Sequence, residues 1–168
     1  MNENNQLLND LYKKMITYYA GDPNRIQHFI KVHSFARLIA QNENLSDEQL
    51  LILEAAAYVH DIGIKPAEQK HGNCSGRLQE QYGPPEAEAM LKTCGFSEKQ
   101  IMRVSYLVGH HHTYTNIDGI DYQILIESDF LVNLYEDNCK EDVIQHTYQE
   151  IFKTETGKSI CRTMFGIK

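Results

Sequence analysis

The stretch Ala55-Ala56-Ala57-Tyr58-Val59-His60-Asp61-Ile62-Gly63 decides how the rest of the chain is interpreted. An apolar, alanine-rich helical pattern runs into a His-Asp pair and stops at a glycine. Burying an unpaired carboxylate is unfavourable by several kcal/mol, or forces the group to take up a proton. A divalent cation offsets that penalty, because His and Asp are both common ligands for one. The pair therefore predicts further metal ligands elsewhere in the chain.

Helical periodicity continues on both sides of this stretch. Ser46 and Gln49 have the spacing of a capping box, which opens a helix that ends near His60, and Ser97 and Gln100 form a second capping box. A helix with a wide apolar face precedes it, from Pro23 to about Asn42. Further helices are predicted at about 6–19, from Pro84-Pro85 to Gly95, from Ser97 into His110-His111-His112, at about 120–135 and at about 140–152.

Two stretches lack a clear helical pattern. Residues 64–82 are predicted to form a long loop, of a length that is often a lid or a binding loop. The tail 154–168 stays unassigned, although some of its apolar residues could cover the core.

Length and composition suit one all-α domain. The chain has 168 residues, of which 42% are hydrophobic and 23% are charged, an ordinary globular mixture. No strand alternation or hairpin signal is present. We therefore expect a single-domain helical bundle of about six to eight helices, in which residues 1–168 form one domain. Its core is expected at about 22–137, with the N-terminal helix and the C-terminal tail packed on it.

Charge and cysteine usage exclude several classes of partner. The formal net charge of −7 argues against a protein that binds a nucleic-acid backbone. No apolar run approaches the roughly 20 residues of a membrane span, and the polar N-terminus does not resemble a signal peptide. The four cysteines form no C-x-x-C pair, so free thiols and a cytoplasmic location are expected.

Polar residues on apolar helix faces are the candidate ligands. His28 is in line with Val32 and Ala36, and Asp129 follows Leu125 by four positions, so both side chains are expected to point inward. A single inward histidine is more often a satisfied core residue than a ligand. Four such polar groups on three helices are harder to explain as satisfied core residues. They are His28, His60, Asp61 and Asp129. Two imidazoles and two carboxylates suit Mn, Fe, Co, Ni, Zn or Mg without choosing among them.

The order of these residues resembles the HD-domain superfamily of metal-dependent phosphohydrolases. The motif residues are His28 in Arg25–Val32, then His60-Asp61, then Asp129 in Glu127–Leu131, and they match the H…HD…D pattern of that family over roughly residues 22–137. The resemblance implies a helical bundle in which these four residues hold the principal metal ion.

A second histidine-rich segment also resembles part of this family. Val108-Gly109-His110-His111 is similar to a segment of HD proteins that bind two metals, so His110 and His111 are candidates for a second metal or for contact with a phosphate. The alternative is an exposed helix end, where positive charge is mildly favoured. His112 is the weakest candidate of the three.

Two departures from the family pattern limit these expectations. Two-metal HD enzymes usually carry a further histidine at the start of the helix that here contains Gly83-Pro84-Pro85, and this chain has none there. The nucleotidase branch has a glutamate shortly after the HD pair, where this chain has Ile62-Gly63-Ile64-Lys65.

The predicted function is metal-dependent hydrolysis of a phosphate ester bond in a small phosphorylated metabolite or nucleotide. Asp61 is expected to orient the attacking water. Arg25, one helical turn before His28, and Lys65, just after the HD pair, are the candidate phosphate contacts. The alternatives are a non-catalytic metal or nucleotide-binding module, and an oxygenase with two irons, against which the missing histidine argues.

Overall fold

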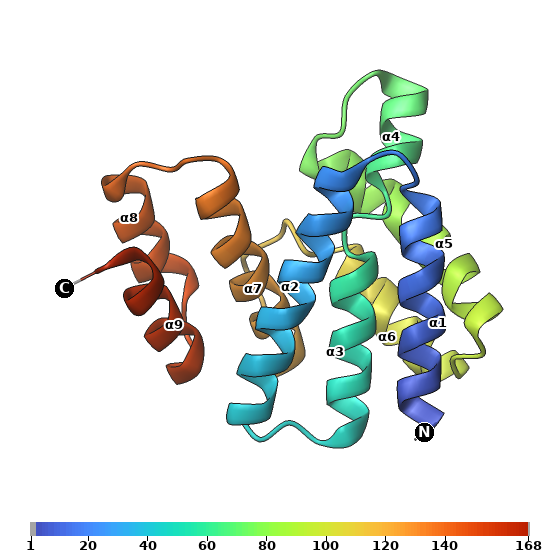
Figure 1. Ribbon diagram of the computed structural model, residues 1–168, viewed down its shortest axis with the longest axis horizontal. Helices are drawn as coiled ribbons and strands as arrows, with labels where there is room; N and C mark the ends of the chain where they lie inside the picture. Colours follow the sequence, from blue (N-terminus) through green and yellow to red (C-terminus); the bar gives the residue numbers. More distant parts are fainter. Residues whose placement is uncertain (1–2, 168) are drawn as a thin grey trace.

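Nine α-helices, joined by short turns, make up the part of the chain that the computed structural model describes, residues 3–167 (Figure 1). They are α1 (Glu3–Tyr18), α2 (Pro23–Asn42), α3 (Asp47–Val59), α4 (Ile64–His71), α5 (Gly76–Cys94), α6 (Glu98–Val108), α7 (Ile120–Glu136), α8 (Glu141–Ile151) and α9 (Glu155–Phe165). The described residues contain no strand. The prediction of an all-α, single-domain fold is confirmed.

The central helices are α2, α3 and α7. Helix α2 packs against both α3 and α7, and α3 also contacts α1 and α6 (Figure 1). Every residue of α3 from Leu51 to Val59 is buried, as expected of a helix that is apolar on all sides. Helices α8 and α9 lie beside α7, on the side away from α1 (Figure 1). The His-Asp pair at the end of α3 is therefore at the centre of the molecule.

Both predicted capping boxes are present. Ser46 accepts a hydrogen bond from the backbone of Gln49 at the start of α3, and Ser97 does the same with Gln100 at the start of α6. Each satisfies N–H groups that a helix start leaves without partners. Because the capping box fixes where α3 begins, His60 lies at the C-terminal end of that helix.

The prediction of a loop over residues 64–82 is wrong. Residues 64–71 form α4, and α5 begins at Gly76, so Pro84 and Pro85 lie inside that helix and do not open it. Pro66 lies in the first turn of α4, where the missing N–H has no helical partner to lose.

Tertiary packing explains how α5 continues through its prolines. The turn after α3 lies directly on α5, so that a Cβ atom on Gly63 would stand 2.5 Å from the carbonyl oxygen of Gln79 and 2.7 Å from the amide nitrogen of Gly83. Gly83 is itself in close contact with α6, since its own Cβ would meet Val108 at 2.6 Å. These contacts hold the helix together where two proline residues remove N–H donors.

The tail forms a helix, α9, which is anchored to α7. The buried carboxylate of Glu127 accepts hydrogen bonds from the backbone N–H groups of Lys153 and Thr154, from the Thr154 hydroxyl and from the amide of Gln123. Thr154 in turn caps α9 by accepting from the N–H of Gly157. None of the described helices is both long and apolar enough to cross a membrane.

Candidate metal centre

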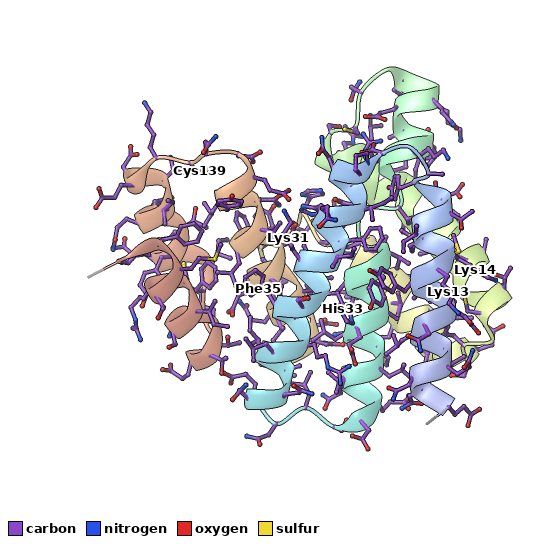
Figure 2. All side chains as sticks on the ribbon, in the orientation of Figure 1. Lys13, Lys14, Lys31, His33, Phe35 and Cys139 are labelled. Carbon is purple, nitrogen blue, oxygen red and sulfur yellow. The ribbon has the colours of Figure 1, made fainter. Side chains whose placement is uncertain are left out.

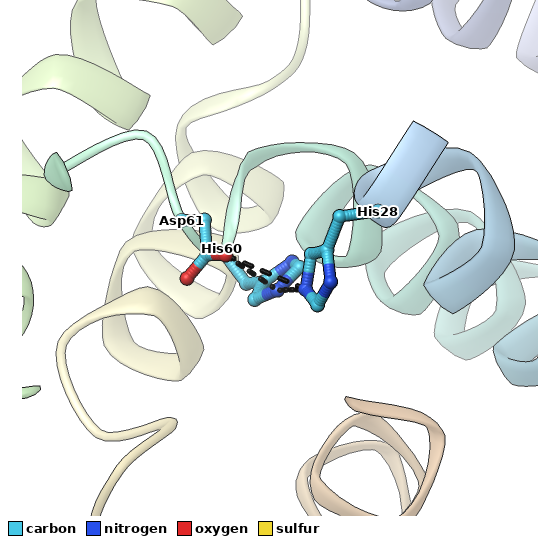
Figure 3. A group of neighbouring side chains, drawn as sticks. All are labelled: His28, His60 and Asp61. Atoms are coloured by element: carbon cyan, nitrogen blue, oxygen red, sulfur yellow. Dashed lines mark hydrogen bonds and ion pairs between the residues drawn. The ribbon is translucent and has the colours of Figure 1, made fainter. Parts of the chain in front are cut away.

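Three separate parts of the chain bring the four predicted ligands together. His28 lies within α2, His60 and Asp61 lie in the turn directly after α3, and Asp129 lies within α7. Figure 3 shows the ring of His28 directed at His60 and Asp61. The Nε2 atom of His28 is 3.2 Å from Nε2 of His60, 3.2 Å from Oδ1 of Asp129 and 3.4 Å from Oδ2 of Asp61.

Three of the four side chains are almost fully buried. The His60 side chain is fully buried, and those of His28 and Asp129 are 10% and 8% exposed. The side chain of Asp61 is 21% exposed. Asp61 is therefore the most solvent-accessible of the four side chains.

Hydrogen bonds fix which nitrogen of each ring carries the lone pair. The Nδ1 atom of His60 is 2.9 Å from the carbonyl oxygen of Ala57, and that of His28 is 2.8 Å from Oε2 of Glu136. Both partners are acceptors, so each Nδ1 donates its hydrogen, and in the neutral ring Nε2 keeps the lone pair. Two lone pairs and two carboxylate oxygens then face one another. With neutral rings this arrangement repels itself, so it needs either protons on the rings or a cation between the four atoms, and the donor set fits a divalent cation.

The same arrangement shifts the pKa values of its members. Burial alone would lower the pKa of His28, but hydrogen bonding to Asp129 and the charges of Asp61 and Asp129 raise it to about 9. Burial would raise the pKa of Asp61, but His60, His111 and His28 hold it well below its usual range. His28 and His60 likewise lower the pKa of Asp129. Both carboxylates stay ionised, and the centre attracts positive charge.

His111 adds a further nitrogen at the other side of Asp61. Its side chain is buried, Nδ1 donates to the carbonyl of Val108, and Nε2 is 3.4 Å from Oδ1 of Asp61 without a hydrogen-bond partner. Asp61, His111 and His112 lie close enough together to hold a second ion. The structure does not bring His110 to this group, because its ring stacks on Tyr106 and donates to the carbonyl of that residue.

His112 is held by residues of α5 that the sequence did not single out. Its Nε2 is 3.1 Å from Oε1 of Gln79, and its backbone N–H donates to Oε1 of Glu80. Burial and the neighbouring His111 lower the pKa of His112 to about 4, so the ring is neutral. The start of α5 also lies on this ring, since a Cβ on Gly76 would stand 2.8 Å from it.

The two predicted phosphate contacts are placed differently. Arg25 donates to Glu68 at 2.6 Å and lies over the ring of Tyr19, whose hydroxyl donates to the backbone carbonyl of Asp61 at 2.7 Å. It is thus at the rim of the site. Lys65 donates a hydrogen bond to the backbone carbonyl of Tyr18, and its ammonium group lies over the Tyr18 ring. The groove that Lys65 lines contains none of the four predicted ligands.

Glu136, the partner of His28, was not found by sequence reasoning. Its contact with His28 joins residues 108 positions apart. One local signal was available, because Glu136 follows Asp129 by two helical turns and so lies on the same face of α7.

Comparison with known proteins identifies relatives of this arrangement. The family model described as HD domain matches residues 25–150. The chain is also similar to the crystal structure of a predicted HD superfamily hydrolase from an uncultured Thermotogales bacterium, with 27% sequence identity and a TM-score of 0.64, over 96% of this chain and 84% of that one. A comparison with curated proteins found no match.

Proposed function

This chain belongs to the HD domain family, whose members are metal-dependent hydrolases, and from that membership we propose that it hydrolyses a phosphate ester bond in a small phosphorylated metabolite or nucleotide. The proposal is supported by one observation above all. The Nε2 atoms of His28 and His60 lie 3.2 Å apart, and each is 3.2–3.5 Å from a carboxylate oxygen of Asp61 and of Asp129, with Asp61 partly exposed to solvent. A closed structural site would leave no such side open, so the geometry favours catalysis over a binding module.

Each residue has a distinct proposed role. His28, His60, Asp61 and Asp129 would hold a divalent ion, which when bound lowers the pKa of a coordinated water and polarises a phosphoryl oxygen. Asp61 is partly exposed and can accept a hydrogen bond from the attacking water, which would orient that water. His111 lies beyond Asp61, where its unpartnered Nε2 can accept from the same water or help to hold a second ion.

Arg25 is the stronger of the two candidate phosphate contacts. It lies at the rim beside Tyr19, but its guanidinium is held by Glu68 and by Asp22 at 3.3 Å. A phosphate would have to take the place of Glu68 as its partner. Because Lys65 lies in a different groove, we assign it no contact with the phosphate.

The test combines metal analysis with an activity assay. We would measure bound metal in the protein purified without added metal, and turnover on a panel of nucleotides and simple phosphate esters, for the wild type, Asp61→Asn and the exposed control Asp142→Asn. We expect bound metal in the wild type and in the control, with similar turnover. We expect at least a 100-fold loss in Asp61→Asn, since this residue would act on both metal and water.

Two results would contradict the proposal. A wild type that binds metal but hydrolyses no ester would favour the binding module. A wild type that binds no divalent metal, even after reconstitution, would show that the four side chains serve another purpose.

A further inference from the structure

His28 differs from the other two imidazoles around Asp61 in the partner of its Nδ1 atom. His60 donates to the carbonyl of Ala57 and His111 to that of Val108, in each case three residues earlier and at the last turn of a helix. The last carbonyls of a helix have no partner within it, so the chain itself supplies these acceptors. His28 lies inside α2, where the helix already uses its carbonyls. Its acceptor therefore comes from another helix, and it is the carboxylate of Glu136.

The position of Glu136 is unfavourable by local rules. It is the last residue of α7, whose final turn contains no basic residue, and a negative charge at a helix C-terminus is disfavoured by about 0.3–1 kcal/mol. Its two oxygens are held by Lys31 and His28. Lys31 extends from the side of α2 that faces α7 (Figure 2). A residue that is unfavourable within its own helix, but is paired by residues of another helix next to a candidate site, is typical of a functional position.

The charge of this carboxylate is maintained by the same contacts. Burial would raise the pKa of Glu136, but the hydrogen bonds from Lys31 and His28 lower it below its usual value. An ionised carboxylate on Nδ1 makes the opposite nitrogen of an imidazole a stronger metal ligand than a carbonyl does. His28 would then be the most basic of the histidine ligands.

We propose that Glu136, held in place by Lys31, is a positioning residue that fixes the ring of His28 and strengthens its bond to the metal ion. This inference rests on the proposed function, because it assumes that His28 is a metal ligand. The ion pair of Glu136 and Lys31 would then do more than hold the end of α7 against α2. Loss of such a partner typically weakens metal binding by about 10- to 100-fold.

The first test is zinc affinity, measured by competition with a chromophoric chelator. The variants are Glu136→Ala, Glu136→Gln and Lys31→Met, with Glu88→Gln as the control. Glu88 forms an exposed ion pair with Lys92 that has no histidine attached. We expect affinity about 10- to 100-fold weaker in Glu136→Ala. Glu136→Gln should fall between it and the wild type, since an amide oxygen still accepts from His28 but carries no charge. Lys31→Met should show a smaller loss, and Glu88→Gln none.

The second test detects the hydrogen bond between His28 and Glu136 by NMR. In zinc-loaded, ¹⁵N-labelled protein, the Nδ1–H proton of His28 should be shifted downfield and protected from exchange with water. We expect this signal to persist in Glu136→Gln and to disappear in Glu136→Ala. The corresponding proton of His60, bonded to a backbone carbonyl, should be unchanged in both and so controls for a general loss of structure.

The outcomes separate this inference from the proposed function. A wild type that binds no zinc would overturn the proposed function and this inference with it. A wild type that binds zinc while Glu136→Ala binds it equally well would overturn this inference alone. If Glu136→Ala does not fold, Glu136→Gln decides: weaker binding with the His28 signal intact supports the role of the charge, and wild-type affinity overturns it.

Discussion

At the scale of single residues, Glu54 is a buried carboxylate outside the metal centre with a defined set of partners. Its side chain is 4% exposed, and Oε1 accepts from His33 at 2.9 Å and from Arg37 at 2.8 Å. Burial would raise its pKa, but these two partners lower it below the usual 4.5. Glu54 therefore stabilises the fold in its ionised form.

We predict that Glu54→Gln lowers the free energy of unfolding by about 1–2 kcal/mol at pH 7. A carboxyl whose pKa is depressed by folding contributes stability above its unfolded pKa and loses it as the pH falls through the folded value. The difference between wild type and variant should thus be full at pH 7 and shrink below about pH 4.5. Urea denaturation at both pH values measures it. Glu48→Gln, which breaks an exposed pair with Lys99, is the control, and a pH-independent difference for Glu54→Gln would contradict the prediction.

The positions of the candidate ligands were predictable because each one breaks a local pattern. His28 and Asp129 interrupt apolar stripes whose period is visible in the sequence, and the inward direction follows from helix geometry alone. Gln79 and Glu136 were not predictable in this way. They meet their histidine partners across 33 and 108 positions, and a polar residue at a helix surface gives no sign of which distant ring it will contact.

At the scale of helices, prediction from the sequence failed where tertiary contacts override local signals. Gly83-Pro84-Pro85 is a strong helix-breaking signal, yet α5 runs through it. The close approach of Gly63, Gly83 and Val108 is what makes a continuous helix the stable solution there. Capping boxes, by contrast, act within four residues, and both were found correctly at Ser46 and Ser97.

The attachment of α9 to α7 gives a prediction at this scale. Glu127 accepts two backbone hydrogen bonds at Oε1, which a glutamine oxygen could keep, and one from the Thr154 hydroxyl at Oε2. In a glutamine, an NH₂ group would replace Oε2 and face the Thr154 hydroxyl and Gly157. We expect Glu127→Gln to lower the free energy of unfolding by about 2–4 kcal/mol. Hydrogen exchange should show the loss first in α9. An unchanged exchange rate there would show that Glu127 does not hold this helix.

At the scale of the whole molecule, the candidate metal centre joins three helices of the core. Its candidate ligands come from α2, from the end of α3 and from α7, which all pack against one another. An ion that binds only the folded chain stabilises it by about 2.7 kcal/mol at 100 times its dissociation constant. For a chain of this size, that corresponds to a rise of about 5–10 °C in Tm.

We predict this rise when manganese or zinc is added to chelator-treated wild type, and its reversal by EDTA. Asp129→Asn should abolish the shift, and the exposed substitution Asp142→Asn should leave it intact. Differential scanning calorimetry with and without metal measures all three. An equal shift in Asp129→Asn would mean that the ion stabilises the protein from some other location.

The positions of the candidate ligands along the chain have a consequence for the lifetime of the protein. His28 and Asp129 are separated by about one hundred residues, so an ion held by both closes a very long loop, in the manner of a reversible cross-link. Global opening of the fold requires that this link is released. Proteases that cut only the opened chain would then degrade the protein at a rate that falls as the free metal concentration rises. Metal supply would set how long each molecule persists as well as whether it is active.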